Sequence, residues 1–151
     1  LEETFERNLL SKFSTYTNAN SLVNITGTAE DDSLTGTDAK ETIFGKKGDD
    51  TILGGAGDDV IFGDQGDDIL DGGDGDDVLT GKKGADTYVL SSGKDKFKGF
   101  KLKEGDTIEI DSDISYTLVQ SKKNTIIQHD DGVTTVLKVN KDDLAGVIEI
   151  V

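Results

Sequence analysis

Glycine recurs at every ninth position through the middle of this chain. The repeated glycines are Gly27, Gly36, Gly45, Gly54, Gly63, Gly72 and Gly81. Each one opens a nine-residue unit with an acidic residue at position six and an aliphatic or aromatic residue at position eight, such as Asp50 and Ile52 in the unit that begins at Gly45. A short period held this strictly indicates one small structural unit stacked on itself.

Each unit predicts a tight turn followed by a short strand. Residues 54–62 read GGAGDDVIF, in which Gly and Asp dominate the first six positions and three apolar residues follow. Glycine at positions one and four indicates backbone angles that residues with a Cβ resist. Position eight is apolar in every unit, so it must face a core to which successive units contribute opposing strands. We therefore predict an all-β fold, a flattened right-handed parallel β-roll in which two units, or 18 residues, complete one circuit.

The sequence changes character on both sides of the repeat. Residues 1–17 carry an apolar stripe at spacings of three and four, which predicts a short amphipathic N-terminal helix. Residues 90–98 form a degenerate eighth unit, so the predicted roll spans residues 18–98. From residue 99 onward, alternating apolar segments separated by turns predict a C-terminal antiparallel β cap, at residues 99–151, that closes the open end of the roll.

Charge and composition narrow the functional classes. The net charge is −15, and residues 27–89 account for −12 of it through 17 acidic and 5 basic side chains. Such acidity disfavours nucleic acid and anionic membranes as partners. The sequence has no apolar run near the length of about 18 residues that a membrane span needs. It also has no Cys, so a small extracellular domain of this kind would rely on metal instead of disulfides.

The repeated carboxylates predict calcium sites between stacked turns. Calcium takes about six to eight oxygen ligands, whereas magnesium demands a tighter octahedral shell and retains its water. The predicted turns are 27–32, 45–50, 63–68 and 81–86 on one edge of the roll, and 36–41, 54–59, 72–77 and 90–95 on the other. We expect about three to six ions, with the strongest sites among the turns between residues 45 and 86.

Carboxylates at position six and exposed backbone carbonyls of the same turns are the expected ligands. The predicted ligand residues are Asp32, Glu41, Gly45, Lys47, Gly48, Asp50, Gly54, Ala56, Gly57, Asp59, Gly63, Gln65, Gly66, Asp68, Gly72, Asp74, Gly75, Asp77, Gly81, Lys83, Gly84, Asp86 and Asp95. Further acids stand at position five: Asp31, Asp49, Asp58, Asp67 and Asp76. We interpret them as outward-facing groups that strengthen the local field, with direct ligation as the alternative.

The repeat resembles a known family. GGAGDDVIF at residues 54–62 and GGDGDDVLT at residues 72–80 match the pattern G-G-x-G-x-D-x-U-x, where U is a large apolar residue. Over residues 27–98 the chain resembles the RTX, or haemolysin-type calcium-binding, proteins. The resemblance implies a parallel β-roll with calcium between stacked turns, export through a type I secretion channel as an unfolded chain, and folding outside the cell, where calcium is abundant.

The remainder resembles the C-terminal part of such secreted bacterial proteins. Residues 95–100 and 104–108 are similar to the segment after the roll in serralysin-type proteases and in mannuronan epimerase R-modules. Residues 149–151, Glu-Ile-Val, are similar to uncleaved C-terminal secretion signals that end in an acid followed by apolar residues. The resemblance implies an extracellular or cell-surface location, with the type I secretion machinery and an upstream domain of the same polypeptide as partners.

Two functions remain open on the sequence. The first is a calcium-dependent folding and secretion module, because dense negative charge and many glycines oppose folding until cations bind. The alternative is a calcium-dependent module that binds polysaccharide or a cell surface. An enzyme is disfavoured, because His129, which we interpret as a surface residue, is the only His, and neither H-E-x-x-H nor G-x-S-x-G occurs. We expect any catalytic activity in an upstream domain.

Overall fold

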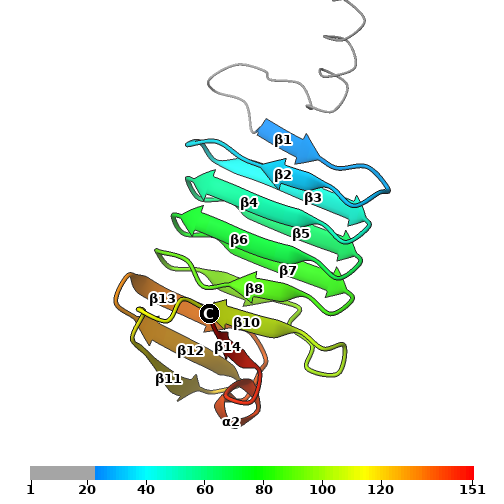
Figure 1. Ribbon diagram of the computed structural model, residues 1–151. Coiled ribbons are helices and arrows are strands. Elements are labelled where there is room, and N and C mark those ends of the chain that lie inside the picture. Colours follow the sequence, from blue (N-terminus) through cyan, green and yellow to red (C-terminus); the bar gives the residue numbers. More distant parts are fainter. Residues whose placement is uncertain (1–22) are drawn as a thin grey trace, which may run out of the picture.

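Two facing β-sheets form the body of the molecule, and the chain passes from one to the other at each turn (Figure 1). This computed structural model describes residues 23–151, so the predicted helix at residues 1–17 lies outside the described part. The repeat strands are β1 (Val23–Thr26), β2 (Ser33–Thr35), β3 (Glu41–Lys47), β4 (Thr51–Ala56), β5 (Val60–Gln65), β6 (Ile69–Asp74), β7 (Val78–Lys83), β8 (Thr87–Val89) and β9 (Lys96–Lys98). The C-terminal elements are β10 (Thr107–Ile110), β11 (Tyr116–Ser121), β12 (Asn124–His129), β13 (Gly132–Val136), α2 (Lys141–Leu144) and β14 (Ile148–Ile150).

Odd- and even-numbered repeat strands separate into different sheets. One sheet has the order β1-β3-β5-β7-β9-β13-β12-β11, and the other has the order β14-β10-β8-β6-β4-β2. Neighbouring repeat strands are parallel and offset by 18 residues, so that Ile43 pairs with Ile61 and Ile52 pairs with Leu70. The predicted parallel β-roll with two units per circuit is confirmed, and the degenerate eighth unit joins it through β9.

Position-eight side chains from the two sheets make the core of the roll. They are Ile43, Ile52, Ile61, Leu70, Leu79, Tyr88 and Phe97, and none is more than 1% exposed. Burying one such side chain fully contributes about 1.5–3 kcal/mol. Because each circuit contacts only the circuits beside it, this stabilisation accumulates strand by strand, and the roll has no thick hydrophobic core.

The core becomes aromatic where the roll meets the C-terminal region. The ring centroid of Tyr88 lies 5.0 Å from that of Phe97 and 5.4 Å from that of Phe100. The Tyr88 hydroxyl accepts a hydrogen bond from the Gly81 N–H at 2.8 Å and donates one to the Lys98 carbonyl at 3.1 Å. This cluster ties the last clear repeat unit to the segment that follows it.

The C-terminal region differs in part from the predicted antiparallel cap. β11, β12 and β13 form an antiparallel meander, as predicted. In contrast, β10 pairs parallel with β8, β14 pairs parallel with β10, and β13 joins β9 in parallel. The reason is that residues 101–106 stack on the turn at residues 81–86 as a repeat turn would. This returns the chain to the six-stranded sheet in the same direction. The short helix α2, capped by the Asn140 side chain, was not predicted.

Glycine serves different needs at positions four and one of the unit. At position four the φ angles run from 103° at Gly48 to 137° at Gly75, so the predicted left-handed geometry is confirmed there. For position one the prediction was wrong, because those glycines do not have positive φ. Instead, a Cβ on Gly54 would lie 2.6 Å from Oδ2 of Asp59, so glycine leaves room for a carboxylate. Besides position four, the position of the unit that has positive φ is position two, as at Gly55 and Gly73.

Candidate metal centre

Turn stacking places the position-six acids in two columns, one on each edge of the roll. One column contains Asp32, Asp50, Asp68, Asp86 and Asp106, and the other contains Glu41, Asp59, Asp77 and Asp95. All of them except the half-buried Asp32 are buried. Burial of a carboxylate is strongly unfavourable unless its charge is compensated. Each column therefore requires either protons or cations.

In every column acid after the first, Asp32 or Glu41, one carboxylate oxygen is bound by the neighbouring turn. Oδ1 of Asp68 accepts a hydrogen bond from the backbone N–H of Asp50 at 2.9 Å, and Oδ1 of Asp77 accepts one from the N–H of Asp59 at 2.7 Å. The same bond, to the N–H of the acid 18 residues earlier, recurs along both columns. It orients each side chain and leaves its second oxygen facing its own turn.

The second oxygen of every interior acid is buried and has no hydrogen-bond partner. These atoms are Oδ2 of Asp50, Asp59, Asp68, Asp77 and Asp86. Each faces the position-one glycine of its own turn, since a Cβ on that glycine would lie closer than 3.0 Å to it. A Cβ on Gly45 would also lie 2.6 Å from the Gly63 carbonyl oxygen. Carboxylate and carbonyl oxygens thus converge on one space, and a cation is the group that fits among such acceptors.

At the ends of both columns the same oxygens have protein donors. The donor pairs are Thr28 to Asp32, Thr37 to Glu41, Ser91 to Asp95 and Lys101 to Asp106. For example, the Ser91 hydroxyl lies 3.2 Å from Oδ2 of Asp95, and the Lys101 backbone N–H lies 2.7 Å from Oδ2 of Asp106. The end acids therefore have donors that the interior acids lack.

Burial raises the pKa values of seven column carboxyls: Asp50, Asp59, Asp68, Asp77, Asp86, Asp95 and Asp106. Desolvation is the largest cause, and the negative charge of neighbouring acids adds to it. The pKa rises to about 7 for Asp68 and Asp95. It rises to about 6 for Asp59, Asp77 and Asp86. These carboxyls therefore ionise less readily than exposed ones, and a bound cation would favour their ionised form.

Stacking also brings together the backbone carbonyls of the predicted ligand set. Position three is aligned through the pairs Lys47–Gln65 and Gln65–Lys83 on one edge and Ala56–Asp74 on the other. The Asp74 and Lys83 carbonyls already accept hydrogen bonds from the N–H groups of Gly57 and Gly66. A carbonyl oxygen retains a second lone pair, so these atoms still have capacity for a cation. Ligation by the predicted residues stays a prediction.

One member of a column, Asp106, was not predicted from the sequence. Asp106 is buried, and its Oδ1 accepts a hydrogen bond from the Asp86 N–H at 3.2 Å. It follows Asp86 by 20 residues instead of 18, which takes it out of the nine-residue frame. The signal that could have found it is the run Gly105-Asp106-Thr107-Ile108, which keeps the order of acid, β-branched residue and apolar residue of a repeat unit.

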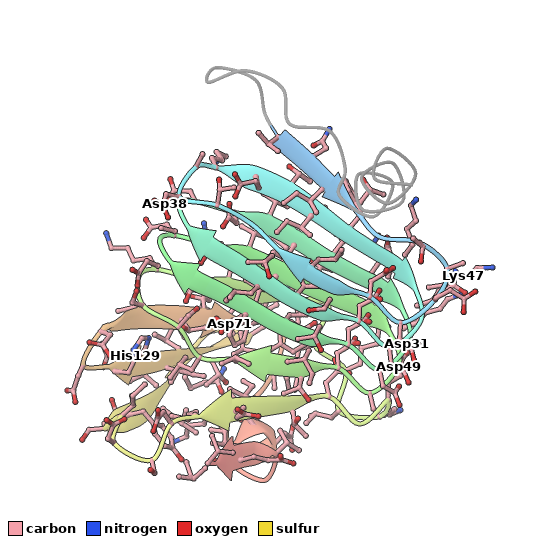
Figure 2. The ribbon with its side chains drawn as sticks, turned by 45° about the horizontal axis from the view of Figure 1, so that its top comes forward. Asp31, Asp38, Lys47, Asp49, Asp71 and His129 are labelled. Atoms are coloured by element: carbon pink, nitrogen blue, oxygen red, sulfur yellow. The ribbon has the colours of Figure 1, made fainter. Side chains whose placement is uncertain are left out.

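Other acids and the histidine lie away from the column interiors. The position-five acids are exposed; Asp49, labelled in Figure 2, accepts a hydrogen bond on Oδ1 from the Asp67 N–H at 2.8 Å. His129 is half-buried at the end of β12, with Nε2 3.4 Å from the Thr134 hydroxyl. Within residues 23–151 no three or more His, Cys, Asp or Glu side chains converge as a metal cluster. A site here would depend on backbone carbonyls with few carboxylates, which is within the ligand range of calcium.

Comparison with known proteins points to the same chemistry. The family of the RTX calcium-binding nonapeptide repeat matches four times, at residues 24–52, 35–70, 53–88 and 63–97. No curated protein sequence matches the chain. Within residues 23–151, no helix has the length and apolar character that crossing a membrane requires.

Two solved structures are similar to this chain. The extracellular lipase LipA from Serratia marcescens is 14% identical with a TM-score of 0.45, and the match covers 91% of this chain and 41% of the lipase. The AlgE6R3 subunit of the Azotobacter vinelandii mannuronan C5-epimerase is 19% identical with a TM-score of 0.33, and the match covers 89% of this chain and 86% of the subunit. The four family matches coincide with the stacked turns and their buried acids. Through residues 24–97, this chain belongs to the RTX calcium-binding nonapeptide-repeat family.

Proposed function

We propose that this chain is a calcium-dependent folding module whose roll is unfolded without calcium and folds on binding about three to six ions between its stacked turns. The observation that carries the proposal is the set of five buried Oδ2 atoms without hydrogen-bond partners, each beside a position-one glycine. We further propose that the ligands are the position-six carboxylates together with backbone carbonyls of the same turns.

The electrostatics of the roll support coupling between binding and folding. Residues 27–89 carry a net charge of −12, and folding places their position-six acids in two buried columns. When bound, calcium supplies the positive charge that the columns lack. Without it, each interior carboxyl must take up a proton or stay ionised and unpaired, and both states disfavour the compact roll at neutral pH.

A matched pair of substitutions tests the proposed ligands. Asp68→Asn keeps an oxygen that accepts the Asp50 N–H, but it replaces the unpartnered Oδ2 with an amide donor. Asp67→Asn makes the same chemical change at the neighbouring residue, which is exposed and accepts the Ala85 N–H. Calcium titrations followed by circular dichroism and calorimetry should show fewer ions bound and a higher folding midpoint for Asp68→Asn only.

Two results would contradict the proposal. Native-like circular dichroism of the unaltered chain in excess EDTA would show that folding does not require calcium. Equal calcium stoichiometry and equal midpoints for the two variants would show that the column carboxylates are not ligands. Each result addresses a different part of the proposal, because folding could need calcium at sites other than these.

We also propose that the chain is exported by a type I secretion system as part of a larger extracellular bacterial protein. The support is its membership of the RTX family and the segment at residues 149–151, an acid followed by two apolar residues, of which Ile150 is 55% and Val151 is 60% exposed. Co-expression with a type I exporter should deliver the chain to the medium. Deletion of residues 149–151 should stop export while calcium-induced folding persists, and continued export of the deleted chain would refute the assignment.

A further inference from the structure

The outer face of the eight-stranded sheet carries a continuous stretch without charge. Strand residues alternate between the two sides of a sheet, so positions seven and nine of the units in β3, β5 and β7 face away from the core. We call these six residues the apolar face, and each is half-buried: Thr42, Phe44, Val60, Phe62, Val78 and Thr80. The rings of Phe44 and Phe62 stack on it with their centroids 5.2 Å apart.

The apolar face is open in the described part of the chain. Strands β3, β5 and β7 pack against their neighbours in the sheet and against the facing sheet, whereas α2 packs on β11 and β12. Neither Phe44 nor Phe62 belongs to the core cluster. Lys82, which pairs with Asp64, borders the face on one side, with its Nζ 4.7 Å from the centre of the Phe62 ring. An uncovered apolar surface of this kind indicates a binding partner.

The outer face of the six-stranded sheet is less suited to an apolar partner. Its position-nine row runs through Leu53, Asp71, Val89 and Glu109, so acids alternate with apolar residues. An apolar partner there would remove the carboxylates of Asp71 and Glu109 from water without a compensating hydrogen bond, which is unfavourable. The apolar face on the eight-stranded sheet imposes no such cost.

We propose that the apolar face is the docking site of residues 1–17 of the same chain. The sequence predicts an amphipathic helix there, with Phe5, Leu9 and Phe13 at spacings of four along its apolar stripe. Residues four apart in a helix rise by about 6 Å, which is close to the spacing of about 4.8 Å between strands. Laid across the strands, the stripe therefore places Phe13, Leu9 and Phe5 over β3, β5 and β7 in turn.

The segment is attached at the right place and has sufficient length. Residues 18–22 join it to β1 and span at most about 18 Å. Strand β1 is the neighbour of β3 in the sheet, so the end of the segment at residue 17 lies near one border of the apolar face. A helix of residues 1–17 is about 25 Å long, and the distance across the strands from β1 to β9 is about 19 Å. The segment can therefore extend over the whole face.

Charge complementarity sets the direction of the segment on the sheet. Beyond β7 the outward rows continue to Lys96 and Lys98 of β9, which are both exposed. Within residues 23–151, no carboxylate lies within ion-pair distance of either lysine. The acids of the segment, Glu2, Glu3 and Glu6, all stand at the end that is farther from β1. Docking from β1 towards β9 therefore brings these acids to the two lysines.

This inference rests on the proposed calcium-dependent folding, because the apolar face is assembled only when the strands stack. Its residues come from three circuits of the roll, and residues in the same row are 18 apart in the sequence. If the roll requires calcium to fold, docking of residues 1–17 requires calcium as well, although no residue of that segment is proposed as a ligand.

Disulfide cross-linking of the whole chain tests the docking. The chain has no Cys, so a pair of introduced cysteines reports a single contact. Leu9→Cys with Val60→Cys places one thiol on the stripe and the other on the apolar face. The control is Leu9→Cys with Ile69→Cys, because Ile69 is an outward residue of the other sheet and is 43% exposed. In saturating calcium we expect the first pair to form an intramolecular disulfide about tenfold faster than the control.

Two outcomes of this experiment would overturn the proposal. Equal rates for the two pairs would show that residues 1–17 have no preference for the apolar face. Disulfide-linked dimers of the first pair, without the intramolecular product, would show that the face is occupied by the segment of a second copy of the chain.

A matched pair of charge substitutions tests the role of the stripe. Phe5→Asp introduces a carboxylate into the stripe, whereas Ser11→Asp introduces one on the other side of the predicted helix, about 200° around its axis from Leu9. In the background of the Leu9–Val60 cysteine pair, we expect Phe5→Asp to slow cross-linking by about tenfold, because a buried aromatic side chain is lost. We expect Ser11→Asp to leave the rate unchanged. Equal rates in the two variants would contradict docking through the stripe.

A second set of cysteine pairs tests the direction and uses sheet positions outside the apolar face. Glu3→Cys with Lys98→Cys joins the first turn of the segment to β9, whereas Glu3→Cys with Thr26→Cys joins it to β1. We expect the pair with Lys98 to form its disulfide faster. Faster reaction of the pair with Thr26 would contradict the direction that the charges indicate.

Circular dichroism of every sample keeps these tests separate from the folding proposal. A chain that folds in calcium but shows no preference for the Leu9–Val60 pair contradicts the docking only. A chain that is folded in excess EDTA and keeps this preference contradicts calcium-dependent folding but supports the docking.

Discussion

The roll and the C-terminal region are built from similar strands but compensate their polar groups differently. In the roll, buried carboxyl oxygens of five acids have no hydrogen-bond partner. In the C-terminal region, the buried Thr125 hydroxyl donates to the Val139 carbonyl at 2.9 Å, and the Asn140 side chain caps α2. Apart from Nδ1 of His129, the C-terminal region therefore satisfies its buried polar groups largely from within, whereas the roll depends on cations or protons from solution. The contrast implies that the two regions respond differently to the same change in conditions.

Calcium removal should produce the largest difference in stability between the roll and the C-terminal region. In excess EDTA we expect amide protons of β3 to β8 to lose nearly all protection from hydrogen exchange, because the columns are left with uncompensated charge. Amides of β11 to β13 should retain more protection, since their hydrogen bonds and apolar contacts do not involve the columns. Hydrogen exchange with mass spectrometry measures both regions in one sample. Equal loss in both would mean that they fold as one unit.

A glycine substitution in each region sharpens the comparison. Gly66 has φ of 129°, and an added Cβ would overlap the Gly48 carbonyl of the turn stacked on it. We expect Gly66→Ala to lower the free energy of unfolding in saturating calcium by about 2–4 kcal/mol. Gly146→Ala is the control, because the nearest atom to its Cβ would be 3.6 Å away. Urea unfolding measures both variants, and similar losses would show that turn stacking does not limit stability.

Acidification should act on the two regions in opposite directions. In the calcium-free chain, the raised pKa of Asp68, about 7, means that the folded roll binds protons more readily than the unfolded chain. This contribution is present below the unfolded carboxyl pKa of about 4 and is lost as pH rises through about 6–7. Burial lowers the pKa of His129, so its contribution is lost as pH falls. Hydrogen exchange in EDTA should show roll protection increasing from pH about 7 to 4 while protection near His129 decreases.

The same acidification should weaken calcium binding. Protons and cations compete for the column carboxyls, so the calcium concentration needed for folding should rise as pH falls below about 6–7. Circular dichroism during calcium titration at each pH measures this midpoint. A midpoint that does not change with pH would mean that groups other than Asp68 and its column neighbours bind the cation.

The strict period explains which parts of the structure could be predicted. Ile52, Asp50 and their counterparts repeat in phase, so the circuit length, the core ladder and both acidic columns follow from spacing alone. Asp106 and the parallel pairing of β10 could not be reached in this way, because a two-residue insertion shifts the frame although the turn still stacks. The space requirement at Gly54 was also hidden, since it depends on a carboxylate held in place by the next turn.

The substitution with the smallest expected effect removes a hydrogen-bond donor from the acid at the end of a column. It tests whether that acid then behaves like the acids inside the column. Ser91→Ala removes the hydroxyl that donates to Oδ2 of Asp95, which leaves that buried oxygen in the same condition as Oδ2 of Asp77. We expect a loss of about 1 kcal/mol in the free energy of unfolding, measured by urea in calcium.

Ser92→Ala is the control for this substitution, because its hydroxyl bonds to the exposed Asp74 at 2.6 Å, and its loss should be under about 0.5 kcal/mol. The folding midpoint for calcium should rise more for Ser91→Ala than for Ser92→Ala, since the last carboxyl of that column then also needs a cation. If the two variants shift the midpoint equally, the hydroxyl donors at the column ends do not reduce the need for calcium, and the distinction between ends and interior has no energetic consequence.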